Sequence, residues 1–132
     1  MNTKIVKEGI DEIIRNGRNS INKREASIKC LQCLDLTSLN STDNEKTIIN
    51  LIGKSSIEEL DSINVAGICV YPTFLKTLSK NLHNKEVKKV VVSGGFPHGQ
   101  LPLELKINEV KFSIDNNAEE IDIVMNRGLF LD

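Results

Sequence analysis

The stretch Val65-Ala66-Gly67-Ile68-Cys69-Val70-Tyr71 is a continuous apolar run, and Pro72 follows it directly. A short uninterrupted apolar run that contains β-branched residues is typical of a strand buried on both faces. Proline is favoured at the first position of a helix, because its missing N–H would have no partner there. The apolar residues that continue at helical spacing are Phe74, Leu75, Leu78 and Leu82. The stretch therefore predicts a buried strand that leads directly into an amphipathic helix.

The same strand-helix unit recurs on both sides of this stretch. In chain order, the other expected elements are a strand at 33–39, a helix that contains Ile48, Ile49, Leu51 and Ile52 and takes its N-cap from 40–43, a strand at 87–92, a helix at about 101–116 and a strand at 121–125. Four apolar strands that alternate with three helices predict parallel pairing, right-handed crossovers and burial on both faces. The fold class is α/β, and periodicity alone leaves a doubly wound sheet and a barrel both open.

The first 29 residues form a separate, basic segment. Residues 4–16 carry Val6, Ile10, Ile13 and Ile14 at helical spacing, and Gly17 is a plausible helix end. Residues 16–22 are polar and predict a linker. The basic residues are interpreted as a solvated helix face rather than as an arm that binds nucleic acid. We therefore divide the chain into an amino-terminal helix and linker at 1–29 and an α/β region at 30–132.

Composition excludes several classes of protein. The chain has 132 residues, a net charge of −1, 39% hydrophobic residues and 27% charged residues, which is ordinary for one small globular domain. This charge balance provides no overall field for nucleic acid or an anionic membrane. No apolar run approaches the length of a membrane span, and the amino terminus lacks a signal peptide's apolar block. Three cysteines are too few for a disulfide framework, so a cytoplasmic location is expected.

Polar residues at the predicted strands suggest a site. Asp122 lies inside an otherwise apolar strand, where a buried carboxylate costs free energy unless it is paired or hydrogen-bonded. Asp35 and Thr37 lie near the end of the first strand, and Cys69 lies near the end of the second. Sites in parallel α/β folds form at the carboxyl ends of strands, where acids from different strands can pass protons or hold a ligand hydroxyl. Structural roles, a buried acid at Asp122 and a turn brace at Asp35, are the alternatives.

Other motifs give weaker signals. Cys30 and Cys33 have CxxC spacing, but the pair enters a predicted strand instead of opening a helix, and nearby ligands for zinc are missing. The loop Gly94-Gly95-Phe96-Pro97-His98-Gly99 matches no phosphate-loop or dinucleotide fingerprint. It adds Ser93, two glycines and His98 near the strand ends, and His98 is interpreted as a loop residue. Arg127 could reach a ligand anion or pair with a neighbouring acid.

Three segments together resemble the deoxyribose-phosphate aldolase family. They are Leu34-Asp35-Leu36-Thr37-Ser38-Leu39, Ala66-Gly67-Ile68-Cys69-Val70-Tyr71-Pro72 and Glu119-Glu120-Ile121-Asp122-Ile123-Val124-Met125-Asn126-Arg127. Gly95-Phe96-Pro97-His98-Gly99 resembles the family's loop after its third strand. The order and spacing of the segments also match, over about residues 31–132. The resemblance implies a (β/α)8 TIM barrel, of which this chain holds strands one to four, preceded by an amino-terminal helix.

The same resemblance implies a chemistry. Members of the family are class I aldolases, carbon–carbon lyases of deoxyribonucleotide catabolism, which cleave 2-deoxyribose 5-phosphate to acetaldehyde and glyceraldehyde 3-phosphate through a Schiff base. Asp122 matches the family's catalytic acid, Asp35 and Thr37 match polar residues near the substrate, and Cys69 matches a cysteine beside the pocket. No metal or cofactor is implied. The family's two lysines and its phosphate loops belong to later strands, and no lysine of this chain replaces the nucleophile.

Two functions from different classes follow. The first is the amino-terminal half of such an aldolase, a fragment that alone lacks the cleavage step. The second is a non-catalytic half-barrel that binds a small sugar or a partner protein through the strand ends. Exposed edges on the outer strands predict association with a carboxyl-terminal half or with a second copy of the chain. No nucleic acid or membrane partner is expected. A flavodoxin-like domain is a weaker third interpretation, because no phosphate-binding turn supports it.

Overall fold

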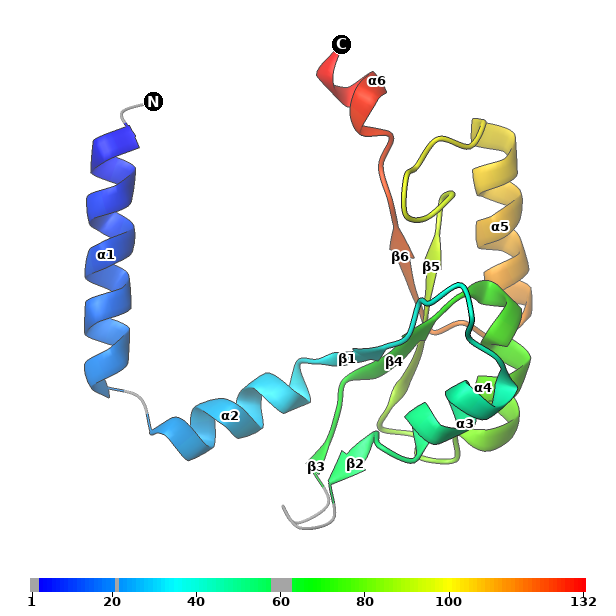
Figure 1. Cartoon of the computed structure of the whole chain (residues 1–132), viewed down its shortest axis with the longest axis horizontal. Coiled ribbons are helices and arrows are strands. Elements are labelled where there is room, and N and C mark those ends of the chain that lie inside the picture. Colours follow the sequence, from blue (N-terminus) through cyan, green and yellow to red (C-terminus); the bar gives the residue numbers. More distant parts are fainter. Residues whose placement is uncertain (1–2, 21, 58–62) are drawn as a thin grey trace. The chain divides into compact units, whose positions relative to one another are not determined.

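The computed structural model describes residues 3–20, 22–57 and 63–132. The chain divides into two compact units, residues 1–30 and residues 31–132. Figure 1 labels the helices and strands of both units.

The amino-terminal unit consists of helix α1 (Thr3–Ser20) and most of helix α2 (Lys23–Gln32). The prediction that a helix ends near Gly17 is wrong, since α1 continues to Ser20 and occupies most of the predicted linker. One glycine inside a helix costs only about 1 kcal/mol, which the surrounding turns can offset. Helix α2 was not predicted, because its apolar residues do not gather on one face. The apolar stripe of α1 is solvent-exposed in the structure.

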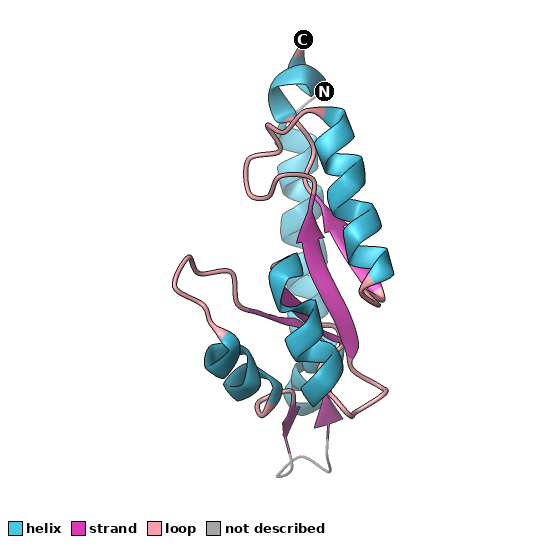
Figure 2. Ribbon diagram, turned by 90° about the vertical axis from the view of Figure 1, so that its right-hand side faces the viewer, coloured by secondary structure: helices cyan, strands magenta, loops and turns pink. Residues whose placement is uncertain are grey.

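The second unit is built on a four-stranded parallel sheet with the order β1-β4-β5-β6 (Figures 1 and 2). Its strands are β1 (Asp35–Thr37), β4 (Gly67–Val70), β5 (Lys88–Ser93) and β6 (Glu120–Ile123). All three pairings are parallel, as predicted. A separate antiparallel pair, β2 (Ser56–Ile57) with β3 (Ile63–Asn64), was not predicted, because two-residue strands are too short to show periodicity.

Helices follow the strands in the predicted alternation (Figure 1). They are α3 (Glu45–Ile52), the 3₁₀ turn η2 (Pro72–Phe74) that leads into α4 (Leu75–Asn81), α5 (Leu103–Asp115) and the unpredicted α6 (Arg127–Leu131). The N-cap of α3 is Asn44, whose side chain accepts a hydrogen bond from the Thr47 N–H, so the predicted caps at 40–43 are wrong. Asp43 instead organises the preceding turn by accepting from Ser38 Oγ at 2.8 Å.

The main core lies between the sheet and helices α3 and α4. Its fully buried members include Ile48, Ile68, Leu75, Leu78 and Val91. Each such side chain contributes about 1.5–3 kcal/mol by leaving water. The prediction that all four strands are buried on both faces holds for β4 and for most of β5. It is wrong for β1 and β6, because they are the outer strands of the sheet and each has only one neighbour.

None of the described helices combines the length and the apolar character that a membrane span requires.

Candidate active site

The predicted site residues gather on the sheet face opposite the main core. Side chains alternate along a strand, so Ile68 and Val70 point into the core while Cys69 points to the other face. Cys69 packs there against Val90 and Val92. In the sheet register Thr37 lies opposite Cys69, and Asp122 lies opposite Val92. Strands that are far apart in the sequence therefore bring the four predicted residues to one face.

The Cys69 thiol is the buried centre of this group. Its Sγ donates to Asp122 Oδ2 at 3.8 Å, a contact between residues on β4 and β6. Burial raises the pKa of Cys69 to about 12, and the nearby Asp122 and Asp35 carboxylates add to the shift by repelling a thiolate. A hydrogen bond with the Thr37 hydroxyl acts weakly in the opposite direction. The thiol is therefore neutral at physiological pH and serves as a small hydrogen-bond donor.

The side chain of Asp35, the first residue of β1, is another carboxylate of this group. Partial burial raises its pKa, and the negative charges of Glu120 and then Asp122 raise the pKa further. The Thr37 hydroxyl donates locally to the Asp35 carbonyl oxygen at 2.9 Å. Glu120 is thus a member of the site that was not predicted. Its signal in the sequence is the spacing with Asp122, since residues two apart on a strand share a face.

Asp122 itself differs from the sequence-based expectation. The side chain is exposed, not buried, because β6 is the last strand of the sheet and nothing among the described residues covers that edge. The prediction that Asp122 is a buried acid is therefore wrong for this chain. Its position beside Cys69 and near Asp35 is the observation that remains.

Two other residues near the strand ends are not brought into the site. Ser93 is fully buried, its hydroxyl has no hydrogen-bond partner among the described residues, and alternation after Val92 turns it to the other face. His98 is exposed in its loop, as predicted. No group of three or more potential metal ligands occurs within the described ranges. Arg127 begins α6 with an exposed side chain.

The cysteines with CxxC spacing lie in helix α2 and just beyond its end. Cys30 lies in α2, Cys33 lies in the turn after it, and both are exposed free thiols. The prediction that the pair enters a strand is wrong, since β1 begins only at Asp35, after the turn that contains Cys33.

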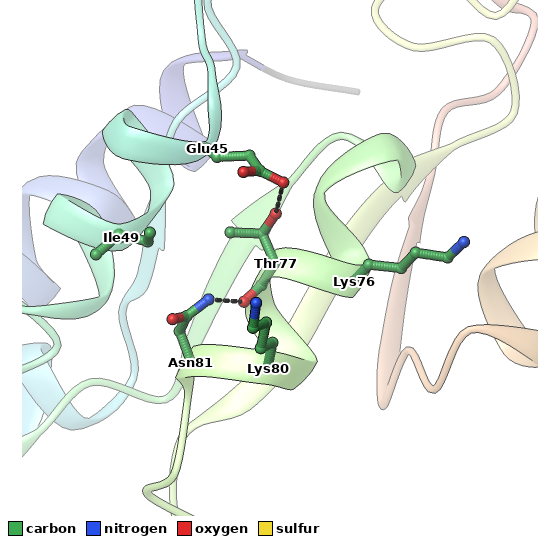
Figure 3. Close-up of a pocket in the computed structure, with 6 residues that line it drawn as sticks. All are labelled: Glu45, Ile49, Lys76, Thr77, Lys80 and Asn81. Carbon is green, nitrogen blue, oxygen red and sulfur yellow. Dashed lines mark hydrogen bonds between the residues drawn. The ribbon is translucent and has the colours of Figure 1, made fainter.

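The lysines of β5 and α4 lie at the amino end of the strand or in the helical layer. Lys88 and Lys89 enter β5 at its amino end, as predicted, and both pair with Glu119, at 3.8 Å and 2.7 Å. Lys76 and Lys80 belong to α4, on the helical side of the sheet. Both belong to the lining of a hollow of about 160 Å³ between α3 and α4, where Thr77 donates to Glu45 at 3.5 Å. The lining residues are drawn in Figure 3. This hollow belongs to the helical layer and does not open onto the Cys69 group.

Gly67 leaves room for the Asp35 carboxylate, because a side chain at this position would collide with it. A Cβ atom at Gly67 would lie 2.5 Å from Val90 Cγ2 and 2.7 Å from Asp35 Oδ1. We expect Gly67→Ala to lower the free energy of unfolding by about 1–3 kcal/mol and to displace the Asp35 carboxylate. Urea unfolding measures the loss. Gly53→Ala is the matched control, since its Cβ would have 3.5 Å to its nearest neighbour at an ordinary helical φ. Equal stabilities of the two variants would contradict the close approach.

The chain is similar to known proteins over part of their length. No protein-family model matches the chain. A curated protein of Caenorhabditis elegans, named as a deoxyribose-phosphate aldolase, is 34% identical over 132 residues, which cover 96% of this chain and 43% of that protein. The chain therefore spans less than half the length of this relative.

Solved structures agree on the fold. A crystal structure named as a deoxyribose-phosphate aldolase from Coccidioides immitis matches 94% of this chain and 50% of its own chain, with a TM-score of 0.71 and 23% identity. The deoxyribose phosphate aldolase from Aeropyrum pernix, described as tetrameric, matches 77% of this chain and 41% of its own, with a TM-score of 0.64 and 25% identity. The predicted fold class, the parallel α/β half of a (β/α)8 barrel, is confirmed. The resemblance indicated by the sequence motifs is confirmed as a similarity: the chain is similar to proteins named as deoxyribose-phosphate aldolases and spans half of their length or less.

Proposed function

We propose that this chain is the amino-terminal half of a deoxyribose-phosphate aldolase. The observation that carries the proposal is the convergence of Asp35, Thr37, Cys69 and Asp122 on one face of the sheet. The reaction is the cleavage of 2-deoxy-D-ribose 5-phosphate to acetaldehyde and D-glyceraldehyde 3-phosphate through a Schiff base. In the proposal the protein acts in deoxyribonucleotide catabolism in the cytoplasm. Its three free cysteines are compatible with that reducing compartment.

Each residue of the group has a role that its surroundings support. Asp122 is exposed toward the open side of the sheet, so its carboxylate can reach a substrate and accept or return a proton. Asp35 and Thr37 present oxygen atoms that can hold a substrate hydroxyl. The neutral Cys69 thiol holds the Asp122 carboxylate by donating to it at 3.8 Å. Glu120 adds a further negative charge beside Asp35.

The Schiff-base nucleophile has to come from elsewhere. A nucleophilic lysine must be desolvated or placed beside another cation to be neutral near pH 7. Lys88 and Lys89 are paired with Glu119 at the opposite end of β5, and Lys106 and Lys111 belong to α5. In the proposal, the lysine belongs to the other half of the barrel, and residues 3–132 alone do not catalyse cleavage.

Open edges support assembly with that other half. Strands β1 and β6 each have one neighbour, and a groove of about 410 Å³ lies between β6 and α5. Its apolar lining is supplied by Leu103, Ile107, Val110 and Ile123. Exposed strand edges and apolar surface of this kind favour association. We propose that a carboxyl-terminal half occupies this side, whether as a separate chain or as a continuation, and that a second copy of the chain competes for the same edge.

A non-catalytic binding module is the alternative function. It is favoured by the absence of any lysine at the carboxyl end of a strand within residues 31–57 and 63–132. In this alternative the Asp35, Thr37 and Asp122 face binds a small sugar without turnover.

Complementation tests the proposal. The chain is mixed with the separately expressed carboxyl-terminal half of the Caenorhabditis elegans relative, and acetaldehyde release from 2-deoxyribose 5-phosphate is followed. We expect cleavage only in the mixture, and borohydride should trap the substrate on the added half. Binding of the sugar phosphate to the chain alone, with no turnover in a mixture that forms a stable complex, would contradict the aldolase proposal and favour the binding module.

A further inference from the structure

The glycine loop after β5 is held by two charged side chains of α5. Glu109 Oε2 accepts hydrogen bonds from the N–H of Gly94 at 2.7 Å and from the N–H of Gly95 at 2.9 Å. Lys106 Nζ donates to the Gly99 carbonyl oxygen at 2.6 Å. Hydrogen bonds that involve a charged partner are roughly twice as strong as neutral ones. The loop is therefore anchored to one helix at both of its ends.

The same loop packs against the segment that follows Asp122. Gly94 and Gly99 have positive φ angles of 82° and 70°, which glycine adopts without strain. A Cβ atom at Gly99 would collide with the Met125 carbonyl group, and one at Gly94 would lie 3.1 Å from Val124 O. The loop thus contacts both α5 and the chain just beyond β6.

Phe96 is the side chain that this arrangement positions. Its ring meets the ring of Tyr71 edge to face, with centroids 6.3 Å apart and an interplanar angle of 67°. Both rings pack on the small cluster of Cys69, Val90 and Val92. The two aromatic rings therefore stand at the apolar side of the candidate site, next to the thiol that contacts Asp122.

We propose that Glu109 and Lys106 are positioning residues, which hold Phe96 against Tyr71 and so maintain the apolar wall of the site. Neither residue is a catalytic residue here, because each acts through the loop backbone. The use of this wall with a sugar phosphate rests on the proposed function, whereas the anchoring itself does not. Loss of Glu109 frees two N–H groups and releases the loop, and loss of Lys106 frees one carbonyl group.

Tyr71 provides the reporter for this proposal. It is the only tyrosine of the chain, and the chain has no tryptophan, so intrinsic fluorescence comes from the residue that contacts Phe96. Acrylamide quenching of the 132-residue chain measures how open Tyr71 is. We expect quenching of Glu109→Ala to rise roughly twofold, with Lys106→Met rising less, because a loop without its anchors opens locally. Glu109→Gln should restore most of the protection, since its amide oxygen still accepts from both glycines.

Glu104→Ala is the matched control, an exposed acid in the first turn of the same helix with no hydrogen bond or ion pair among the described residues. Its quenching should equal that of the parent. Folding is checked by circular dichroism. If Glu109→Ala does not fold, the quenching of Lys106→Met is compared with that of Glu109→Gln instead. A lower melting temperature with unchanged Tyr71 quenching in the folded variants would overturn the proposal and leave a purely structural role. Because no substrate is used, the result is independent of aldolase activity.

Discussion

Asp122→Asn, assayed in a barrel completed by a carboxyl-terminal half as proposed, is expected to lower kcat by roughly 10²–10⁴-fold, the usual contribution of one positioned acid or base. Asparagine has nearly the same shape but cannot carry a proton between substrate and water. The Asp122 carboxylate is exposed at the open side of the sheet, so its oxygen atoms are available to a substrate. The measurement is acetaldehyde release at saturating substrate, together with the concentration that gives half-maximal rate.

The same substitution should leave the fold intact. Asp122 contributes one long contact, the 3.8 Å hydrogen bond from Cys69, and its charge disfavours ionisation of its neighbours. We therefore expect the free energy of unfolding to change by about 0.5 kcal/mol or less, as at most exposed positions. Asp115→Asn, an exposed acid at the end of α5, is the matched control for removal of one charge. Turnover of Asp122→Asn close to that of the parent would remove Asp122 from the mechanism.

The central strand-helix unit could be predicted because its signals are local and agree with one another. The apolar run through Ile68 and Val70 is the length of one strand, and Pro72 opens the following helical turn. Parallel order and alternation then bring Thr37, Cys69 and Asp122 to one face, with no further information needed. The face of the candidate site was therefore predictable once the four strands had been found.

The exposure of the outer strand was not predictable from the same pattern. An apolar sequence predicts burial, yet Ile123 is 64% exposed and Leu103 on α5 is 72% exposed. Burial depends on neighbours, and the described residues contain no strand beyond β6. The short elements β2, β3 and α6 were missed because two to five residues cannot show a period. Glu109 was missed because its partners are backbone N–H groups, which leave no trace in side-chain patterns.

Cys69 is expected to react with iodoacetamide about a thousandfold more slowly than an ordinary exposed thiol near pH 8, because the thiolate is the reactive form. Its pKa is about 12 instead of the ordinary 9.0, first through burial and then through the charges of Asp122 and Asp35. The exposed thiols of Cys30 and Cys33 serve as internal references in the same sample. Alkylation of each cysteine is followed by mass spectrometry of its peptide, and in concentrated urea all three rates should converge.

The pH dependence has a definite sign. The folded pKa of Cys69 lies above the unfolded value, so the fold favours the protonated thiol and binds a proton more tightly than the unfolded chain. The associated stability is fully present below pH 9 and declines as the pH rises toward 12. Asp122→Asn removes a charge that repels the thiolate, so it should lower the Cys69 pKa and speed alkylation, whereas Asp115→Asn should change neither. Equal alkylation rates for Cys69 and Cys30 in the folded chain would contradict the burial of the thiol beneath Tyr71 and Phe96, and with it the geometry of the site.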